Sequence, residues 1–241
     1  MIFIWLVASL SMAIQEKQTG YDGPPPTATT IPINRVFEVL AEPISPGHYP
    51  DVLIEAGRRL GLTVLPGLEI ETSEEVHVLA LFEEVSQAID MQSIVYSHLP
   101  DLPNDEAVYG AQLVVDADDQ FVRRETRRLL VATSLSLSDT FSLASALGGI
   151  SIPAHVDRTA YGLVGVLGFV PPEPSFPALE VSRHARVHDY ARPGRAAIRS
   201  SDAHDLDDLG RATTDFVVAQ PTLAEIVLAC RGEEGRRVEV I

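Results

Sequence analysis

The chain has 241 residues, of which 46% are hydrophobic and 22% are charged, and its formal net charge is −16 at pH 7. This composition excludes a disordered protein, and the length allows one large α/β domain or two small ones, with a sizeable core either way. Cys230 is the single cysteine, which excludes an intrachain disulfide and a cysteine-based zinc site. The acidic surface repels nucleic-acid phosphates at long range, although a local arginine cluster can reverse the sign inside a cleft.

The amino-terminal part of the chain divides into an apolar run and a proline-rich segment. Residues 1–13, MIFIWLVASLSMA, are too short to span a bilayer and lack the basic start of a signal peptide. They predict a buried first strand and a cytoplasmic protein, with a signal sequence ending near S-M-A as the alternative. Residues 14–34 hold three consecutive prolines and four threonines, which indicates a loop.

From residue 48 the pattern becomes regular. Residues 49–60 have helical spacing, and residues 62–71, LTVLPGLEIE, predict a strand, a turn and a second strand. Residues 76–82, VHVLALF, are apolar and rich in β-formers, which predicts a buried strand. A helix is expected to begin near Glu83.

The central region alternates between loops and one clear helix. Residues 99–122 form acidic, proline-containing loops around a short β-like LVV, and RRETRRL at 123–129 is too charged for a core, which predicts a solvated turn or helix. Residues 134–148 combine a Ser-x-x-Asp start, an apolar stripe and a closing Gly148, which predicts a capped helix.

The last third of the chain again alternates strands with helices. The predicted strands are residues 149–157, 177–183, 196–204 and 216–220, and a helix with Thr222 as its N-cap follows. This alternation predicts a largely parallel sheet or barrel, in which the chemistry gathers at the carboxyl ends of the strands.

Polar side chains lie beside apolar runs in four of these segments. They are Glu69, His77, His155 and the close pair Asp202 and His204. Each has a structural alternative when taken alone: a strand-edge charge, a core histidine bonded to a carbonyl, a loop histidine or a helix-capping pair. Together they predict one site, because buried polar groups need partners and these would supply one another's. Imidazole with carboxylate suits Zn²⁺, Mn²⁺ or Fe²⁺.

Five stretches in order, VLPGLEIET, EEVHVLALF, YSHLPDLPND, GGISIPAHVDR and RSSDAH, resemble the PHP (polymerase and histidinol phosphatase) superfamily of metal-dependent phosphoesterases. The resemblance runs from about residue 48 to the carboxyl terminus. It implies a distorted (β/α)7 TIM-like barrel that forms a single domain over 1–241, with 48–241 as the family-like core. It also implies up to three divalent ions at the carboxyl ends of the strands, with manganese, zinc or iron as the metal.

The resemblance gives each candidate residue a role. Glu69 resembles a carboxylate that bridges two metals, and with His77 and His155 it completes one metal position. Asp202 resembles a ligand of a second position, and His204 a ligand of a third. Glu69, His155 and Asp202 are therefore expected to take part in catalysis.

Two arginines stand beside these motifs. Arg158 follows His155 closely, and Arg199 precedes the Ser-Ser-Asp of Asp202. A planar guanidinium binds phosphate in a bidentate manner, so both are candidates for substrate binding. Surface ion pairs with the many acidic residues are the alternative.

Residues 1–47 depart from the family pattern. The family opens with H-x-H on its first strand and carries a later T-D-H-N turn, and neither motif is present here. We therefore expect this segment to be divergent and the first strands of the barrel to be irregular or incomplete, with most ligands of the second and third metal positions missing.

The function implied is phosphatase-type hydrolysis of a small phosphomonoester, such as histidinol phosphate or a nucleotide, with activity impaired by the missing ligands. The alternative is a non-catalytic PHP-like protein that binds one metal or a phosphorylated ligand. A weaker alternative is an amidohydrolase-like C–N hydrolase. The net negative charge disfavours a long nucleic acid as a partner, no membrane partner is expected, and the oligomeric state stays open.

Overall fold

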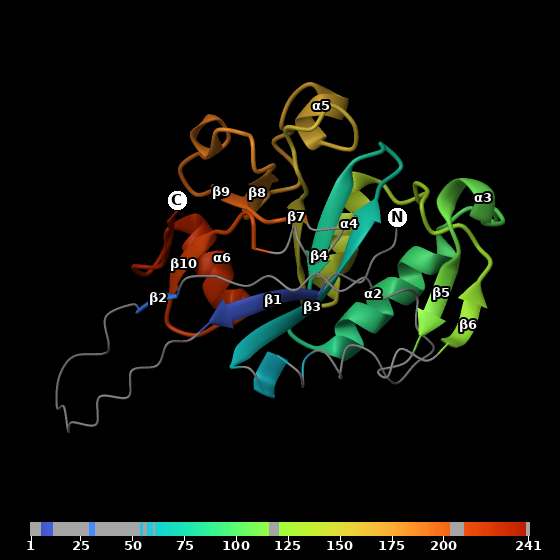
Figure 1. Cartoon of the computed structure of the whole chain (residues 1–241). Coiled ribbons are helices and arrows are strands. Elements are labelled where there is room, and N and C mark those ends of the chain that lie inside the picture. The colour runs from blue at the N-terminus through green and yellow to red at the C-terminus, as the bar shows by residue number, and fades with distance from the viewer. Residues whose placement is uncertain are drawn as a thin grey trace.

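The computed structural model describes residues 6–11, 29–31, 54, 57–59, 61–115, 121–202 and 210–239. These residues form a mixed α/β fold (Figure 1). The strands are β1 (Leu6–Ser11), β2 (Thr29–Ile31), β3 (Leu62–Glu71), β4 (His77–Leu81), β5 (Gln112–Val115), β6 (Phe121–Glu125), β7 (Ile150–Pro153), β8 (Ala178–Val181), β9 (Ala196–Arg199), β10 (Asp215–Val218) and β11 (Arg237–Glu239). The helices are α2 (Val85–Ser97), α3 (Glu106–Tyr109), α4 (Leu137–Ala146), α5 (Leu163–Leu167), the 3₁₀ turn η1 (Val187–Asp189) and α6 (Leu223–Arg231).

The central sheet has the order β1-β3-β4-β7, and each neighbouring pair in it is antiparallel. β3 and β4 are joined by a short turn in which the amide of Thr72 donates to the carbonyl of Val76. A connection this short can only join antiparallel strands, because a parallel pair needs a crossover of about a dozen residues or more. The hairpin therefore places the carboxyl end of β3 beside the amino end of β4.

β3 is one continuous strand, although the sequence predicted a strand, a turn and a strand. Residues 62–66 pair with β1, and residues 67–71 pair with β4. The change of partner falls at Pro66, whose missing N–H would interrupt a ladder shared with one neighbour throughout. The Pro-Gly signal thus marks a change of partner within the strand.

The remaining strands form smaller sheets, ordered β11-β10-β2, β5-β6 and β8-β9. Of the pairs among the described strands, β8 and β9 are parallel and the others are antiparallel. The prediction of a largely parallel sheet is therefore wrong for this part of the chain. The described strands pair in four sheets, and a closed barrel ladder is not seen among them.

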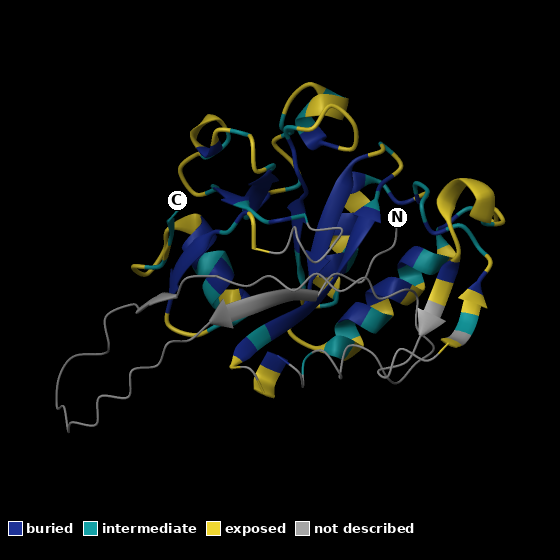
Figure 2. Ribbon diagram, viewed as in Figure 1, coloured by how far each residue is buried: buried dark blue, intermediate teal, exposed yellow. Residues whose placement is uncertain are grey.

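Helices cover the central sheet where the apolar stripes predicted them. α4 begins at the N-cap Ser136, which forms a capping box with Asp139, and α6 begins at Thr222, whose hydroxyl accepts from the amide of Glu225. α2 packs on β3 and β4 through Met91 and other apolar residues. β3, β4 and β7 are buried along most of their length (Figure 2).

The charged segment 123–129 lies at the periphery of the fold. The predicted turn or helix at 123–129 begins as the last part of β6, which pairs with β5 as a peripheral ribbon where charged side chains reach solvent. Cys230 of α6 is packed in the hydrophobic core, and its burial raises the pKa of the thiol to about 12. No helix in the described part of the chain has the length and apolarity needed to cross a membrane.

Candidate metal centre

The β3–β4 hairpin positions the first two residues of the site. Side chains alternate across a strand, so Leu68 and Ile70 face the α2 side of the sheet while Glu69 and Glu71 face the other. His77 lies directly opposite Glu71 in the ladder and therefore shares their face. Its Nδ1 lies 3.0 Å from Oε1 of Glu69, and its Nε2 lies 3.9 Å from Oε2 of Glu71.

His155 reaches the same point from the end of β7. β7 runs antiparallel to β4, with Pro153 opposite Val78, so its carboxyl end also lies beside the amino end of β4. Nε2 of His155 lies 3.4 Å from Oε1 of Glu69. One ligand atom from each of Glu69, His77 and His155 falls within 4.8 Å of the other two, and all three residues are buried. The structure thus brings these three predicted residues together, and their role as metal ligands stays a prediction.

Interactions among the three side chains shift the pKa values of Glu69 and His155. Burial alone would raise the pKa of Glu69, but hydrogen bonds and charge interactions with His155 and His77 outweigh it and lower the pKa to about 2. Burial lowers the pKa of His155, but the hydrogen bond with Glu69 and the charges of Glu180 and Glu69 raise it overall. The cluster is therefore an ionised carboxylate between two imidazoles.

Tyr161 closes one side of the cluster. Its ring stacks on the imidazole of His77, with centroids 4.5 Å apart and an interplanar angle of 20°. Its carbonyl accepts from the amide of His77. The backbone and the ring of Tyr161 thus both fix the orientation of that imidazole.

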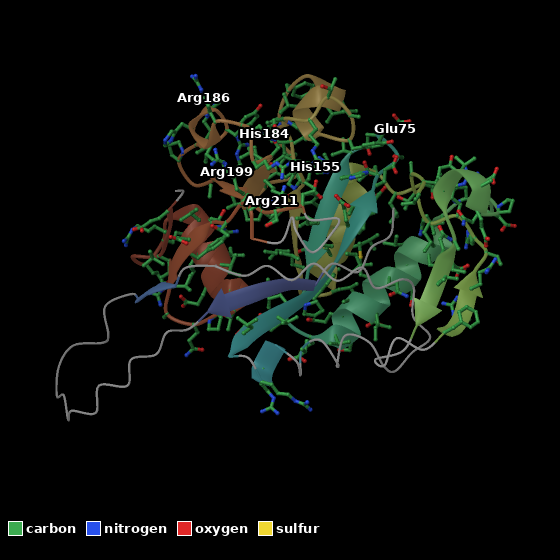
Figure 3. The ribbon with its side chains drawn as sticks, viewed as in Figure 1. Glu75, His155, His184, Arg186, Arg199 and Arg211 are labelled. Atoms are coloured by element: carbon green, nitrogen blue, oxygen red, sulfur yellow. The ribbon has the colours of Figure 1, made fainter. Side chains whose placement is uncertain are left out.

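A cavity of about 430 Å³ opens beside the cluster at the carboxyl ends of β8 and β9. It is lined by His155, Arg158, Glu180, Ser182, Arg183, His184, Ser200, Ser201 and Asp202. His155 is thus shared between the buried cluster and the cavity. Figure 3 shows His155 and His184 in the same part of the molecule.

Glu180 is a site residue that the sequence analysis missed. It lies in β8, is buried and accepts a hydrogen bond from the hydroxyl of Ser200. Burial, helped by the charges of Asp202 and Glu69, raises its pKa to about 7 against the opposing effects of His155 and Ser200. The available signal was a glutamate inside the apolar run ALEV, the same pattern that drew attention to Glu69 in GLEI.

Asp202 and Arg158 form an ion pair in the cavity. Nη2 of Arg158 contacts Oδ2 of Asp202, and the Arg158 side chain is 46% exposed whereas that of Asp202 is 12% exposed. Asp202 and His155 both have positive φ angles, 45° and 29°, a backbone conformation that most non-glycine residues avoid. Asp202 and His155 line the same cavity, but the carboxylate of Asp202 pairs with Arg158 and not with the imidazole of His155.

Arg199 and His204 complete the predicted set. The guanidinium of Arg199 donates to the carbonyl of Ala185, and this residue is not among those that line the cavity. His204 lies outside the described residues. Substrate binding by Arg199 and metal binding by His204 stay predictions.

The β7–α5 loop connects the buried cluster of Glu69, His77 and His155 to the cavity at the ends of β8 and β9. The carboxylate of Asp157 accepts from the amide and the hydroxyl of Ser182 at the end of β8. A Cβ atom on Gly165 in α5 would overlap the carbonyl oxygen of Arg158, so glycine is required for this close packing. The loop that carries His155 and Arg158 is therefore held on both sides.

The position of the cluster corrects one expectation about strand ends. The sequence predicted that all the candidates lie at carboxyl ends of strands, but His77 begins β4. The reason is the hairpin, which brings the start of one antiparallel strand beside the end of its neighbour. The edge that holds the site is formed by the ends of β3, β7, β8 and β9 and by the start of β4.

The buried residues could hold a divalent cation. Two imidazoles and a carboxylate are the donor set that zinc and similar transition metals take in open, catalytic-type sites. Nδ1 of His155 is buried and has no hydrogen-bond partner among the described residues. A buried polar atom without a partner costs free energy, and a bound ligand can remove that cost. Glu69, His77 and His155 are thus the residues that would bind the metal.

Comparisons with known proteins show the fold. No protein-family model and no curated protein matches the sequence. A crystal structure of the novel lesion-specific endonuclease PfuEndoQ from Pyrococcus furiosus is similar with a TM-score of 0.51 and 19% identity, covering 70% of this chain and 39% of that one. An Endonuclease Q complex with a 27-mer duplex substrate that has an abasic lesion at the active site is similar with a TM-score of 0.46, the same identity and the same coverage. The match spans 39% of the length of these proteins, and the similarity to the first of them shows a shared fold.

The comparison contradicts the predicted partners. A small phosphorylated substrate was expected and a long nucleic acid was disfavoured, but the similar structure with a TM-score of 0.51 is that of a lesion-specific endonuclease. The physical reason is that net charge averages over the whole surface. A local arrangement of arginines governs what a cleft attracts.

Proposed function

We propose that this protein is a metal-dependent hydrolase that cleaves phosphodiester bonds in nucleic acid. The observation that carries the proposal is the buried group Glu69, His77 and His155, whose ligand atoms lie within 4.8 Å of one another. His155 also lines the adjoining cavity, whose lining residues are polar or charged and include arginines and serines. The endonuclease neighbours share the fold and add support for the nucleic-acid substrate.

Each residue has a defined part in this reaction. A bound divalent ion would supply Lewis acidity and a nucleophilic water at neutral pH. Glu69 is ionised and offers the anionic ligand, while His77 and His155 offer neutral nitrogen ligands when they are unprotonated. The stacked ring of Tyr161 keeps His77 in place before binding. The cluster is thus organised in advance.

The cavity residues would bind the scissile phosphate. Arg158 is half exposed and can exchange its contact with Asp202 for a phosphate oxygen, because a partly solvated ion pair is weak. Arg183 lines the same cavity, and its guanidinium offers further donors. Asp202 would then be released toward the reacting centre, where the family resemblance places a metal ligand.

Metal content and hydrolysis of a DNA oligonucleotide with Mn²⁺ test the proposal together. Wild-type protein should contain a divalent metal by mass spectrometry and should cleave the oligonucleotide. His77→Ala should reduce the bound metal several-fold and slow cleavage, because it removes one of the three donors. His184→Ala is the control, since this exposed residue lines the cavity but lies outside the donor group, and it should keep its metal.

One observation favours a second candidate function. Asp202 contacts Arg158 and is not one of the three grouped donors, so the described residues assemble donors for one cation. A protein that binds one metal or a phosphorylated ligand without turnover is consistent with this arrangement. One equivalent of metal with no cleavage of DNA or of bis(p-nitrophenyl) phosphate would support that role and contradict the hydrolase.

A further inference from the structure

The β8–β9 connection has a charge opposite to that of the whole chain. Residues 182–195 contain four arginines, two histidines and one acidic residue, Asp189. The rest of the sequence has 14 lysines and arginines against 33 acidic residues. The connection is therefore a local basic segment, which we name the basic loop, on a strongly acidic protein.

The basic loop begins inside the cavity and continues onto the surface. Ser182, Arg183 and His184 line the cavity, and Arg186 and Arg192 follow along the loop as exposed residues. Nε of Arg183 donates to Nε2 of His184, which couples the two side chains at the rim. Figure 3 shows Arg186 outward of His184, so that positive charge extends away from the site.

The loop is a defined structure beside the site. Val187, the first residue of η1, is buried against β8 and β9 in the core, and Arg192 and Arg195 form an isolated β-bridge. The carbonyl of Ala185 accepts a hydrogen bond from Arg199 of β9. The arginines of the loop are therefore presented from a fixed backbone.

We propose that the basic loop binds the backbone phosphates that flank the scissile bond of a nucleic acid. This inference rests on the proposed function, since it names how that site would hold its substrate. A small phosphomonoester would end inside the cavity, where Arg183 already contributes a cation. The continuation of arginines to Arg186 and Arg192 fits a ligand that carries further phosphates beyond the cavity.

Physical chemistry favours arginine for this contact. The guanidinium is charged at all accessible pH values and presents paired donors that match phosphate oxygens. Contacts of this kind release counterions from the nucleic acid, so they fix the position of the strand without reading its sequence. The loop would attract the polymer locally while the acidic remainder of the surface repels it elsewhere.

Binding measured without metal tests this inference separately from catalysis. A fluorescein-labelled DNA oligonucleotide, offered as single strand and as duplex, is titrated with the protein in EDTA at several KCl concentrations. The variant R183Q/R186Q/R192Q should lose affinity by about tenfold or more. The slope of log affinity against log salt should fall by about 2, since each lost phosphate contact removes roughly 0.7–0.9.

The matched control removes the same charge elsewhere. R124Q/R231Q/R237Q replaces three arginines that are exposed on β6, α6 and β11. It should keep the wild-type slope and change affinity by less than about twofold. The single variant R186E, at an exposed position, should weaken binding on its own and guards against misfolding of the triple variant.

Every outcome decides one of the two proposals. Equal binding by the loop variant and the control, or no binding of DNA by the wild type at low salt, overturns the role of the basic loop. Binding of DNA in EDTA without any cleavage in Mn²⁺ overturns the hydrolase and leaves the loop as a nucleic-acid clamp. Cleavage of bis(p-nitrophenyl) phosphate with unaltered DNA binding by the loop variant overturns the loop alone.

Discussion

The two halves of the site differ in how they satisfy their charges. On the side of β3, β4 and β7, Glu69, His77 and His155 are buried and interact mainly with one another. On the side of β8 and β9, Arg158 and Asp202 form an ion pair that is partly exposed, and the basic loop extends into solvent. The first half is a closed polar group, and the second is an open one that can exchange its partners.

This difference suits the closed half to binding a cation and the open half to binding substrate phosphates. Desolvation makes a buried group with an unsatisfied atom costly, so the closed half gains most from a bound cation. Solvent screens the open half, so its ion pairs contribute little to stability and can be replaced by substrate phosphates. Glu180 lies between them, buried like the first half but belonging to the cavity of the second.

The largest expected effect comes from breaking the closed half. Glu69→Gln keeps the shape of the side chain but removes the anion between the two imidazoles, so Mn²⁺ affinity should fall by more than about 100-fold, beyond the loss typical of an outer-shell change. Isothermal titration calorimetry measures the affinity. Glu233→Gln, the same change at an exposed position, is the control. Unchanged affinity in Glu69→Gln would show that this group is not the metal site.

A change at Glu180 should separate the two halves by pH. Its folded pKa of about 7 lies above the ordinary value of 4.5, chiefly through burial, so the folded state binds this proton more tightly than the unfolded state. The free energy of unfolding of the metal-free protein should therefore fall as pH rises from about 4.5 to about 7. Glu180→Gln has no proton to lose, and at pH of about 8 it should be more stable than wild type by on the order of 2–3 kcal/mol.

Urea denaturation in EDTA at both ends of that pH range measures this difference. The two proteins should differ least at the acidic end, where Glu180 is protonated in the folded state and about half protonated in the unfolded state. Glu233→Gln again serves as the control, and it should follow the wild type at each pH. A Glu180→Gln variant with the wild-type pH dependence would contradict the raised pKa.

The smallest expected effect is on the open half. Arg158→Gln removes a partly exposed ion pair, so the free energy of unfolding should change by less than about 1 kcal/mol. Cleavage of DNA should slow by about tenfold or more if Arg158 binds the scissile phosphate, because charge-assisted contacts are the strong ones. Metal affinity at the closed half should stay the same. Full cleavage activity in Arg158→Gln would remove this residue from the substrate site.

Several parts of the structure were predictable from sequence because their causes are local. The caps at Ser136 and Thr222 and the apolar stripes fixed α4 and α6, and a polar residue inside an apolar run identified Glu69 and His77. Such signals need only neighbouring residues. The same rule would have found Glu180, had it been applied to ALEV.

Pairing between distant segments was decided by the tertiary structure. The antiparallel order of β3, β4 and β7, the change of partner at Pro66 and the contact of Arg158 with Asp202 all join residues whose spacing in sequence carries no record of direction or register. Composition gave the chain its acidic average, but only folding placed the arginines of the basic loop beside the cavity. Local propensity acts along the chain, whereas register, burial and electric field depend on what lies across space.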